Sequence, residues 1–301
     1  MRGSDTHASG ASWQSRSKAI FPEHGPWMRG RVMAGQLVPG DRVCPVIIAA
    51  MTATPLTDIH LPMLGTTQLR SVDVAEWIYG HAIPADRRWW TQALAAHGFA
   101  DTLIGDTICR ADIFALADAA PSDPQAALTL LWNSLAWGSG DKLRNNRARI
   151  ASIAADRDGA AAVLQQAAAL SRTDPQGAYH LLYPRNRTAI CNLGPAFFTK
   201  YLYFAGGGDP CHPCCILDEN VALALQKTCG WKSLPLRGWL ASAYQRYATL
   251  LGLWVDEHSL GRPDVIERWL FEEGKRVRND TASKPVRSMR YAPDEKQLVP
   301  E

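Results

Sequence analysis

A helical periodicity of apolar residues runs from Ser71 almost to the end of the chain, and this pattern most constrains the fold. Several segments begin where proline suits a first helical turn, as at Asp123-Pro124 and Asp174-Pro175. Neither a strand–helix–strand alternation nor an internal repeat is visible. The pattern therefore predicts an all-α fold. The expected helices are 71–79, 84–97, 110–119, 123–137, 142–155, 158–171, 174–182, 186–193, 195–205, 218–229, 237–257 and 262–276.

Composition limits the kind of protein this chain can be. Its 301 residues carry a formal net charge of +3, which permits nucleic-acid binding without requiring it. No apolar run is long enough for a membrane span, and the polar stretch from Met1 lacks the apolar segment of a signal peptide. The number of cysteines, seven, is odd, which is consistent with reduced thiols. We expect a cytoplasmic protein with no membrane partner.

The stretch 190–226 holds the residues best suited to chemistry. Gly194 and Pro195 form a break at which a helix ending near Leu193 can turn into a new helix. The new helix has one charged residue, Lys200, on an aromatic face. That face consists of Phe197, Lys200, Tyr201 and Phe204. The pattern predicts a helix-hairpin-helix.

Lys200 and Asp218 each have a chemical and a structural interpretation. Burial favours the neutral form of an amine, which an amine nucleophile needs, but Lys200 could also extend from a core helix to solvent. Asp218 precedes a strong helix former and is a natural N-cap. A carboxylate held there could also deprotonate a nucleophile or stabilise a cationic sugar.

These residues resemble the helix-hairpin-helix DNA glycosylases, and among them the 8-oxoguanine DNA glycosylases. In that family a hairpin leads into a Thr-Lys helix that bears a Schiff-base lysine, and a Val-Asp pair opens a later helix. Thr199-Lys200 is similar to the lysine site, and Leu217-Asp218, 18 residues after the lysine, is similar to the aspartate site. The resemblance covers roughly residues 120 to 270.

A second match lies upstream, in a segment that reads Asn-Asn-Arg-Ala-Arg-Ile over residues 145–150. It is similar to a family segment whose polar residues fill the gap left by a flipped base. The loop before it has small and basic residues, which suits close approach to phosphates. A charged helix face that is only exposed to solvent would show the same residues. The resemblance implies DNA binding by Lys142, Arg144, Asn145, Asn146, Arg147, Arg149 and Gly194.

Two departures from the family pattern bear on the site. The family hairpin usually reads Leu-Pro-Gly-x-Gly, whereas this chain has Leu-Gly-Pro-Ala-Phe from Leu193. Four residues after the lysine, where human-type enzymes place a small polar residue against the base, it has Phe204. The excised base can therefore differ.

The resemblance also implies an architecture of two helical lobes with a less regular N-terminal region. We expect a flexible tail over residues 1–19, and a region over 20–120 that completes one lobe. Between Phe21 and Arg70 we expect loops, a short helix and a little strand. The glycosylase core is expected over residues 121–278 and a disordered tail over 279–301.

The implied activity is excision of a damaged base, with 8-oxoguanine favoured, from double-stranded DNA. Lys200 attacks C1′ of the flipped nucleotide, Asp218 stabilises the sugar cation, and the resulting Schiff base permits strand cleavage by β-elimination. We expect a monomer without a cofactor. The expected base pocket consists of Phe204, Tyr201, Trp239 and Trp269.

The cysteine-rich segment 211–215 raises the possibility of a metal site. Cys211 and Cys214 have the spacing of a zinc half-site, and some of the glycosylases carry an iron–sulfur cluster. In those relatives the cluster cysteines follow the catalytic aspartate, whereas here they precede Asp218 and no second such pair exists. We therefore predict no metal.

Three alternatives stay open from sequence. The same fold could excise another base, such as a hypermodified base in foreign DNA. The chain could be a non-catalytic helix-hairpin-helix module in which Lys200 contacts a phosphate. It could also be an unrelated all-α protein.

Overall fold

Helices make up most of the part of the chain that the structure describes, which confirms the predicted all-α fold. The computed structural model describes residues 54–143 and 145–282. The predicted tail over 1–19, the adjoining residues to 53, Arg144 and residues 283–301 lie outside the described residues. None of the helices in the described part has the length and apolar character needed to cross a membrane.

The first group of helices packs around α5, which is buried along most of its length. Aspartates cap several of its members: the side chains of Asp123, Asp156 and Asp174 accept backbone N–H groups of the first turn of α5, α7 and α8. Proline at the first position of α5 and α8 fits the same starts. The group contains α4 (Arg110–Phe114), α5 (Pro124–Ser139), α6 (Asn146–Ala155), α7 (Arg157–Ser171), α8 (Pro175–Leu182) and α9 (Pro195–Phe204).

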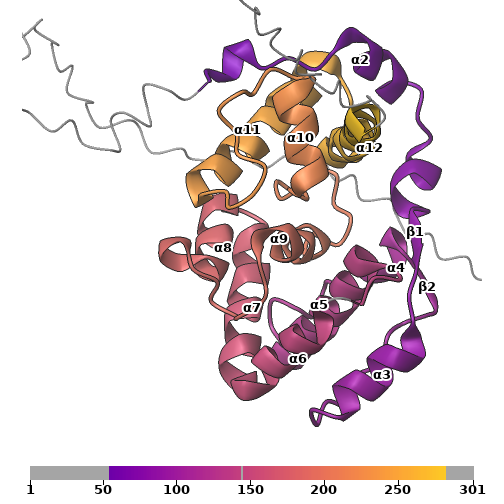
Figure 1. Cartoon of the computed structure of the whole chain (residues 1–301), viewed down its shortest axis with the longest axis vertical. Coiled ribbons are helices and arrows are strands. Elements are labelled where there is room, and N and C mark those ends of the chain that lie inside the picture. The colour runs from indigo at the N-terminus through magenta and orange to yellow at the C-terminus, as the bar shows by residue number, and fades with distance from the viewer. Residues whose placement is uncertain (1–53, 144, 283–301) are drawn as a thin grey trace, which may run out of the picture. The chain divides into compact units, whose positions relative to one another are not determined.

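The second group packs around α12, which contacts α2, α10 and α11 (Figure 1). Gly274 lets α12 approach α10 closely, because a Cβ at that position would overlap the backbone of Asn220. The two groups meet where α8 packs against α11, with the Tyr179 and Tyr244 rings stacked 4.8 Å apart. The second group contains α2 (Met63–Leu69), α10 (Glu219–Lys227), α11 (Ala241–His258) and α12 (Pro263–Ala282).

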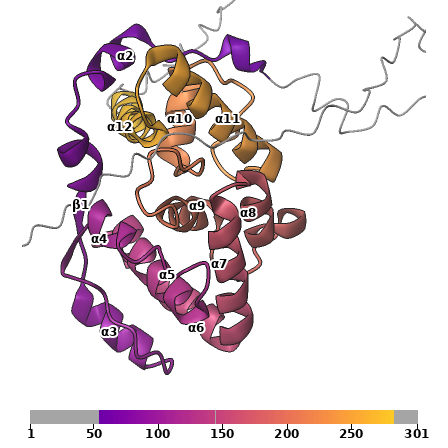
Figure 2. The same cartoon turned by 180° about the vertical axis from the view of Figure 1, so that it is seen from behind.

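With the exception of η1, the short elements before α4 run along one side of both groups, as the view from behind also shows (Figure 2). They include a two-stranded antiparallel pair, in which Ala82 of β1 lies opposite Cys109 of β2. The sequence pattern did not predict these strands. The elements are η1 (Leu56–Asp58), η2 (Ala75–Tyr79), β1 (Ala82–Pro84), α3 (Arg87–Ala95) and β2 (Thr107–Cys109).

The structure differs from several of the expected helices, most clearly at three places. The expected helix 71–79 is reduced to a π-helical turn over Ala75–Tyr79. The expected helix 186–193 is absent from the described chain: η3 (Pro184–Asn186) and turns replace it, and Asn186 and Asn192 adopt left-handed backbone angles that interrupt a helix. The helix before α9 is therefore α8. At the other end α12 continues to Ala282, beyond the predicted helix end at 276.

Candidate active site

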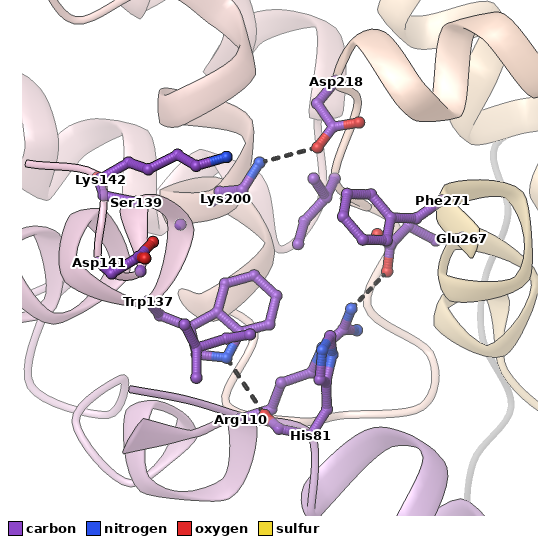
Figure 3. Close-up of a pocket in the computed structure, with 14 residues that line it drawn as sticks. His81, Arg110, Trp137, Ser139, Asp141, Lys142, Lys200, Asp218, Glu267 and Phe271 are labelled. Atoms are coloured by element: carbon purple, nitrogen blue, oxygen red, sulfur yellow. Dashed lines mark hydrogen bonds and ion pairs between the residues drawn. The ribbon is translucent and has the colours of Figure 1, made fainter. Parts of the chain in front are cut away.

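A cavity of about 360 Å³ lies where α5, α9 and α12 converge (Figure 3). Residues from both helical groups line it, so the cavity sits between the groups. Its lining consists of His81, Ile83, Arg110, Trp137, Gly138, Ser139, Gly140, Asp141, Lys142, Lys200, Ile216, Asp218, Glu267 and Phe271.

Lys200 points from α9 toward Asp218 at the edge of this cavity (Figure 3). Its Nζ donates to Asp218 Oδ2 at 3.2 Å and to the Ala196 carbonyl at 2.9 Å. Only 7% of the residue is exposed, so the lysine does not extend along the surface into solvent. The amine is thus held by two acceptors beside an open space.

Asp218 combines the two interpretations that its sequence position allowed. As the N-cap of α10, its Oδ1 accepts the backbone N–H groups of Asn220 at 3.0 Å and Val221 at 3.2 Å. The other carboxylate oxygen, Oδ2, accepts the hydrogen bond from Lys200 Nζ. The cap fixes the carboxylate, so its second oxygen faces the amine in a set orientation.

Two neighbouring residues position the Lys200–Asp218 pair. The Leu217 N–H donates to Thr199 Oγ1 at 3.2 Å, which ties the residue before Asp218 to the residue before Lys200. On α5, Gly138 leaves room for the lysine: a Cβ there would lie 2.7 Å from Lys200 Cδ and 3.1 Å from Cε. A larger residue at 138 would push against the lysine stem.

Arg110 and Glu267 form a buried ion pair in the wall of the cavity, and each residue is only 1% exposed. Arg110 Nη2 donates to Glu267 Oε2 at 3.0 Å. Burial raises the pKa of Glu267 to about 7 against the opposing effect of Arg110, and the negative charge of Asp218 adds to the increase. This carboxyl group therefore changes charge near neutral pH.

Aromatic rings supply the apolar surface of the cavity. Trp137 donates its Nε1 hydrogen to the His81 carbonyl at 3.2 Å, and its ring lies edge-on to the His81 ring. Burial lowers the pKa of His81 to about 3, and Arg110 adds to the decrease. His81 is thus neutral at physiological pH. Phe271 lies one helical turn beyond Glu267 on α12.

Sequence reasoning did not single out Arg110, Glu267 or Phe271 as site residues. The signal for Glu267 was an acidic residue inside the largely apolar run from Val265 to Phe271. No comparable local signal marked Arg110, because its partner lies 157 residues away.

The structure divides the predicted DNA-binding residues into exposed and buried sets. Lys142 lines the cavity, and Asn145 and Arg147 are exposed at the start of α6. Asn146 and Arg149 are buried instead.

Arg149 holds the hairpin region in place. Its guanidinium donates to the Asn192 carbonyl at 3.2 Å and to Asn146 Oδ1 at 2.5 Å, and it stacks 3.7 Å from the Phe197 ring centroid. Burial lowers its pKa to about 10. Gly194, the N-cap of α9, borders a second groove and has open space where a Cβ would lie.

The residues that line this cavity do not include the four aromatics predicted for the base pocket. Tyr201 donates its hydroxyl to the Leu164 carbonyl, and Phe204 packs behind Trp137 with centroids 5.2 Å apart. Trp239 borders the second groove, and Trp269 donates to Gln68 Oε1. Each of these side chains is part of the packed interior, where large aromatic rings bury the most apolar area.

The cysteine-rich segment has a packing role in the described structure. Cys214 and Cys215 are buried, and the Cys214 thiol donates to the Ser171 carbonyl. Residues 54–143 and 145–282 contain no cluster of three or more His, Cys, Asp or Glu side chains that could hold a metal ion. The absence of a metal centre remains a prediction.

The fold class and the site define a recognisable type of protein. An all-α chain in which a buried lysine and an N-capping aspartate meet at a cavity between helical groups has the features expected of a helix-hairpin-helix DNA glycosylase. The chain belongs to the family described as "Putative 8-oxoguanine DNA glycosylase OGG-like protein", which matches residues 76–271, more than half of the chain. That range contains every residue lining the cavity. Comparisons with curated proteins and with solved structures gave no match.

Proposed function

We propose that this protein excises a modified base from duplex DNA through a Schiff base on Lys200 and then cleaves the strand as a lyase. The observation that carries the proposal is the contact between Lys200 Nζ and Asp218 Oδ2 at the edge of the cavity. At 3.2 Å the carboxylate is within reach of the ammonium proton, so Asp218 can take it and leave a neutral amine.

The chemistry then follows from these two groups. The nitrogen of Lys200 bonds to C1′ as the bond from C1′ to the base breaks, and the base leaves with the electron pair and gains a proton. Asp218 offsets the positive charge that develops on the sugar. Loss of a second amine proton and opening of the sugar ring give the Schiff base. Removal of a C2′ proton then breaks the C3′–O bond and cuts the strand.

The cavity provides a suitable place for the flipped base. Trp137 and Phe271 offer apolar ring surfaces, and Glu267 and Arg110 offer polar groups in the wall. Ionised Glu267 can accept from adjacent N–H groups, such as the ring N–H and exocyclic amine of a guanine. This supports a guanine-type base, with 8-oxoguanine favoured. We therefore assign the base pocket to these residues in place of Phe204, Tyr201, Trp239 and Trp269.

Approach to DNA is assigned to exposed groups around the cavity. Lys142 at the lining and Asn145 and Arg147 at the start of α6 are accessible to the duplex. Gly194 leaves the first turn of α9 open to a phosphate. Asn146 and Arg149 act by holding this surface in shape, since both are buried.

The test is borohydride trapping on a duplex containing 8-oxoguanine and, in parallel, on an abasic duplex. We expect a covalent adduct on both that disappears in Lys200→Gln. Lys142→Gln at saturating DNA is the matched control: this second lysine lines the same cavity but is assigned to DNA contact only, so its loss should weaken binding and still permit the adduct. An adduct on the abasic duplex alone would support lyase activity but not excision of 8-oxoguanine. A panel of duplexes with other single lesions would then be tested. Absence of any adduct, with salt-dependent DNA binding, would favour a non-catalytic DNA-binding module instead.

A further inference from the structure

Four residues outside the cavity form an exposed basic and aromatic surface, which we call the α3 ledge. It consists of Arg87, Arg88 and Trp89 in the first turn of α3, and Arg147 in the first turn of α6. The three arginines are exposed and Trp89 is half-buried. The Arg147 guanidinium stacks over the Trp89 ring at 5.3 Å from its centroid, which joins the two helices.

The arginines of the α3 ledge have few partners in the described part of the chain. Arg88 makes no hydrogen bond or ion pair there, and Arg147 makes only the stacking contact. Arg87 donates one long hydrogen bond, 3.4 Å, to Thr102 Oγ1. The guanidinium groups therefore retain donors for a ligand.

Nearby acidic groups do not cancel this charge. Asp86 is occupied as the N-cap of α3, where its Oδ1 accepts the Trp89 N–H at 2.9 Å. Asp106 lines a shallow groove together with Arg87 and Arg88, without an ion pair to either within the described residues. Three cations against these two carboxylates leave the surface positive.

The α3 ledge continues the surface that we assign to DNA. Arg147 lies two residues after Asn145, and the loop before α6 packs on β1, since a Cβ at Gly140 would lie 3.3 Å from Ile83 Cγ2. β1 ends three residues before α3 begins. Both views show α3 beside α6, at the end of the first group away from α2 (Figures 1 and 2).

We propose that the α3 ledge binds the sugar–phosphate backbone of the duplex arm that flanks the flipped nucleotide. This inference rests on the proposed function. Guanidinium groups recognise phosphate through paired hydrogen bonds, and the Trp89 ring limits the freedom that Arg147 loses on binding. The ledge contacts no base edge in this arrangement, so it adds affinity without sequence preference.

The test measures binding of the full chain to a long abasic duplex as a function of salt. The double variant Arg87→Gln/Arg88→Gln, which leaves the already assigned Arg147 in place, should reduce affinity about 10-fold and flatten the slope of log K against log salt by about 2, one unit for each lost phosphate contact. The matched control is Arg70→Gln, which removes an exposed arginine at the end of α2. Its affinity and slope should equal those of the unmodified protein.

Duplexes shortened on one side at a time give a second readout. Shortening the arm on the ledge side should weaken the unmodified protein and leave the double variant unaffected. Borohydride trapping at saturating DNA separates this proposal from the proposed function: the double variant should trap as well as the unmodified protein. Equal salt slopes for the double variant and the Arg70 control would contradict DNA binding by the α3 ledge, even if trapping succeeds.

Discussion

Gly138→Ala tests whether α5 positions the nucleophile. The new Cβ would lie 2.7 Å from Lys200 Cδ and 3.1 Å from Cε, whereas carbon atoms pack at about 3.5 to 4.0 Å. The lysine stem must therefore shift by roughly 1 Å, and a misplacement of that size can cost up to about 100-fold in rate. We expect Schiff-base formation to fall about 10- to 100-fold.

The stability of the same variant should change little. Alanine is favoured over glycine in a helix by up to about 1 kcal/mol, while overpacking costs about 1 to 3 kcal/mol. The side chain that must yield is flexible, so we expect a net loss below about 2 kcal/mol.

The assay is the single-turnover rate of borohydride trapping on an abasic duplex, measured with the melting temperature. Gly252→Ala is the matched control, because Gly252 lies inside α11 with no atom within 4 Å of a Cβ. That variant should trap at the unmodified rate and be slightly more stable. Unmodified trapping by Gly138→Ala would refute the argument that the contact between α5 and Lys200 sets the position of the amine.

Three further predictions concern buried polar groups. The folded-state pKa of Glu267, about 7, exceeds its ordinary value of 4.5. Between these two pH values the folded state binds a proton that the unfolded state does not. The free energy of unfolding therefore falls as pH rises through this window, by roughly 3 kcal/mol. Urea unfolding at pH 5 and pH 8 should show this decrease in the unmodified protein and a smaller one in Glu267→Gln. Thr199→Val should cost about 1 to 3 kcal/mol in urea unfolding, because the buried Leu217 N–H loses its acceptor, and unchanged stability would contradict that role. Arg149→Leu should lower the melting temperature by releasing the Asn192 carbonyl but leave the salt slope of DNA binding unchanged, whereas a flatter slope would identify a direct phosphate contact.

The sequence predicted many of the helices, and it drew attention to Lys200 and Asp218, which the structure brings into contact, where local signals were strong. Proline after a capping aspartate marked the start of α5, and Lys200 and Asp218 were each unusual in their local setting. The expected helix 186–193 failed because Asn186 and Asn192 adopt left-handed backbone angles there, which asparagine tolerates better than most residues. Such angles depend on tertiary contacts, such as the bond from Arg149 to the Asn192 carbonyl.

The lining of the cavity, which we propose as the base pocket, was harder to predict for a related reason. Aromatic residues near Lys200 in sequence looked suitable, yet Phe204 fills the core behind Trp137. The residues that line the cavity come from segments as far apart as His81 and Phe271. Their proximity follows from the packing of α5, α9 and α12, which periodicity cannot specify.

Under the proposed function, the groups that break the bond and the groups that contact the base lie on different helices. Lys200 and Asp218 sit on α9 and at the start of α10, joined by the contact between Thr199 and Leu217. Glu267 and Phe271 both lie on α12. Under the proposed function, a substitution at Phe271 changes the surface offered to the base and leaves the contact between Lys200 and Asp218 in place, whereas a substitution at Glu267 also changes the charge near Asp218. Position 271 is therefore where the proposed substrate range could be diversified while the proposed bond-breaking pair stays constant.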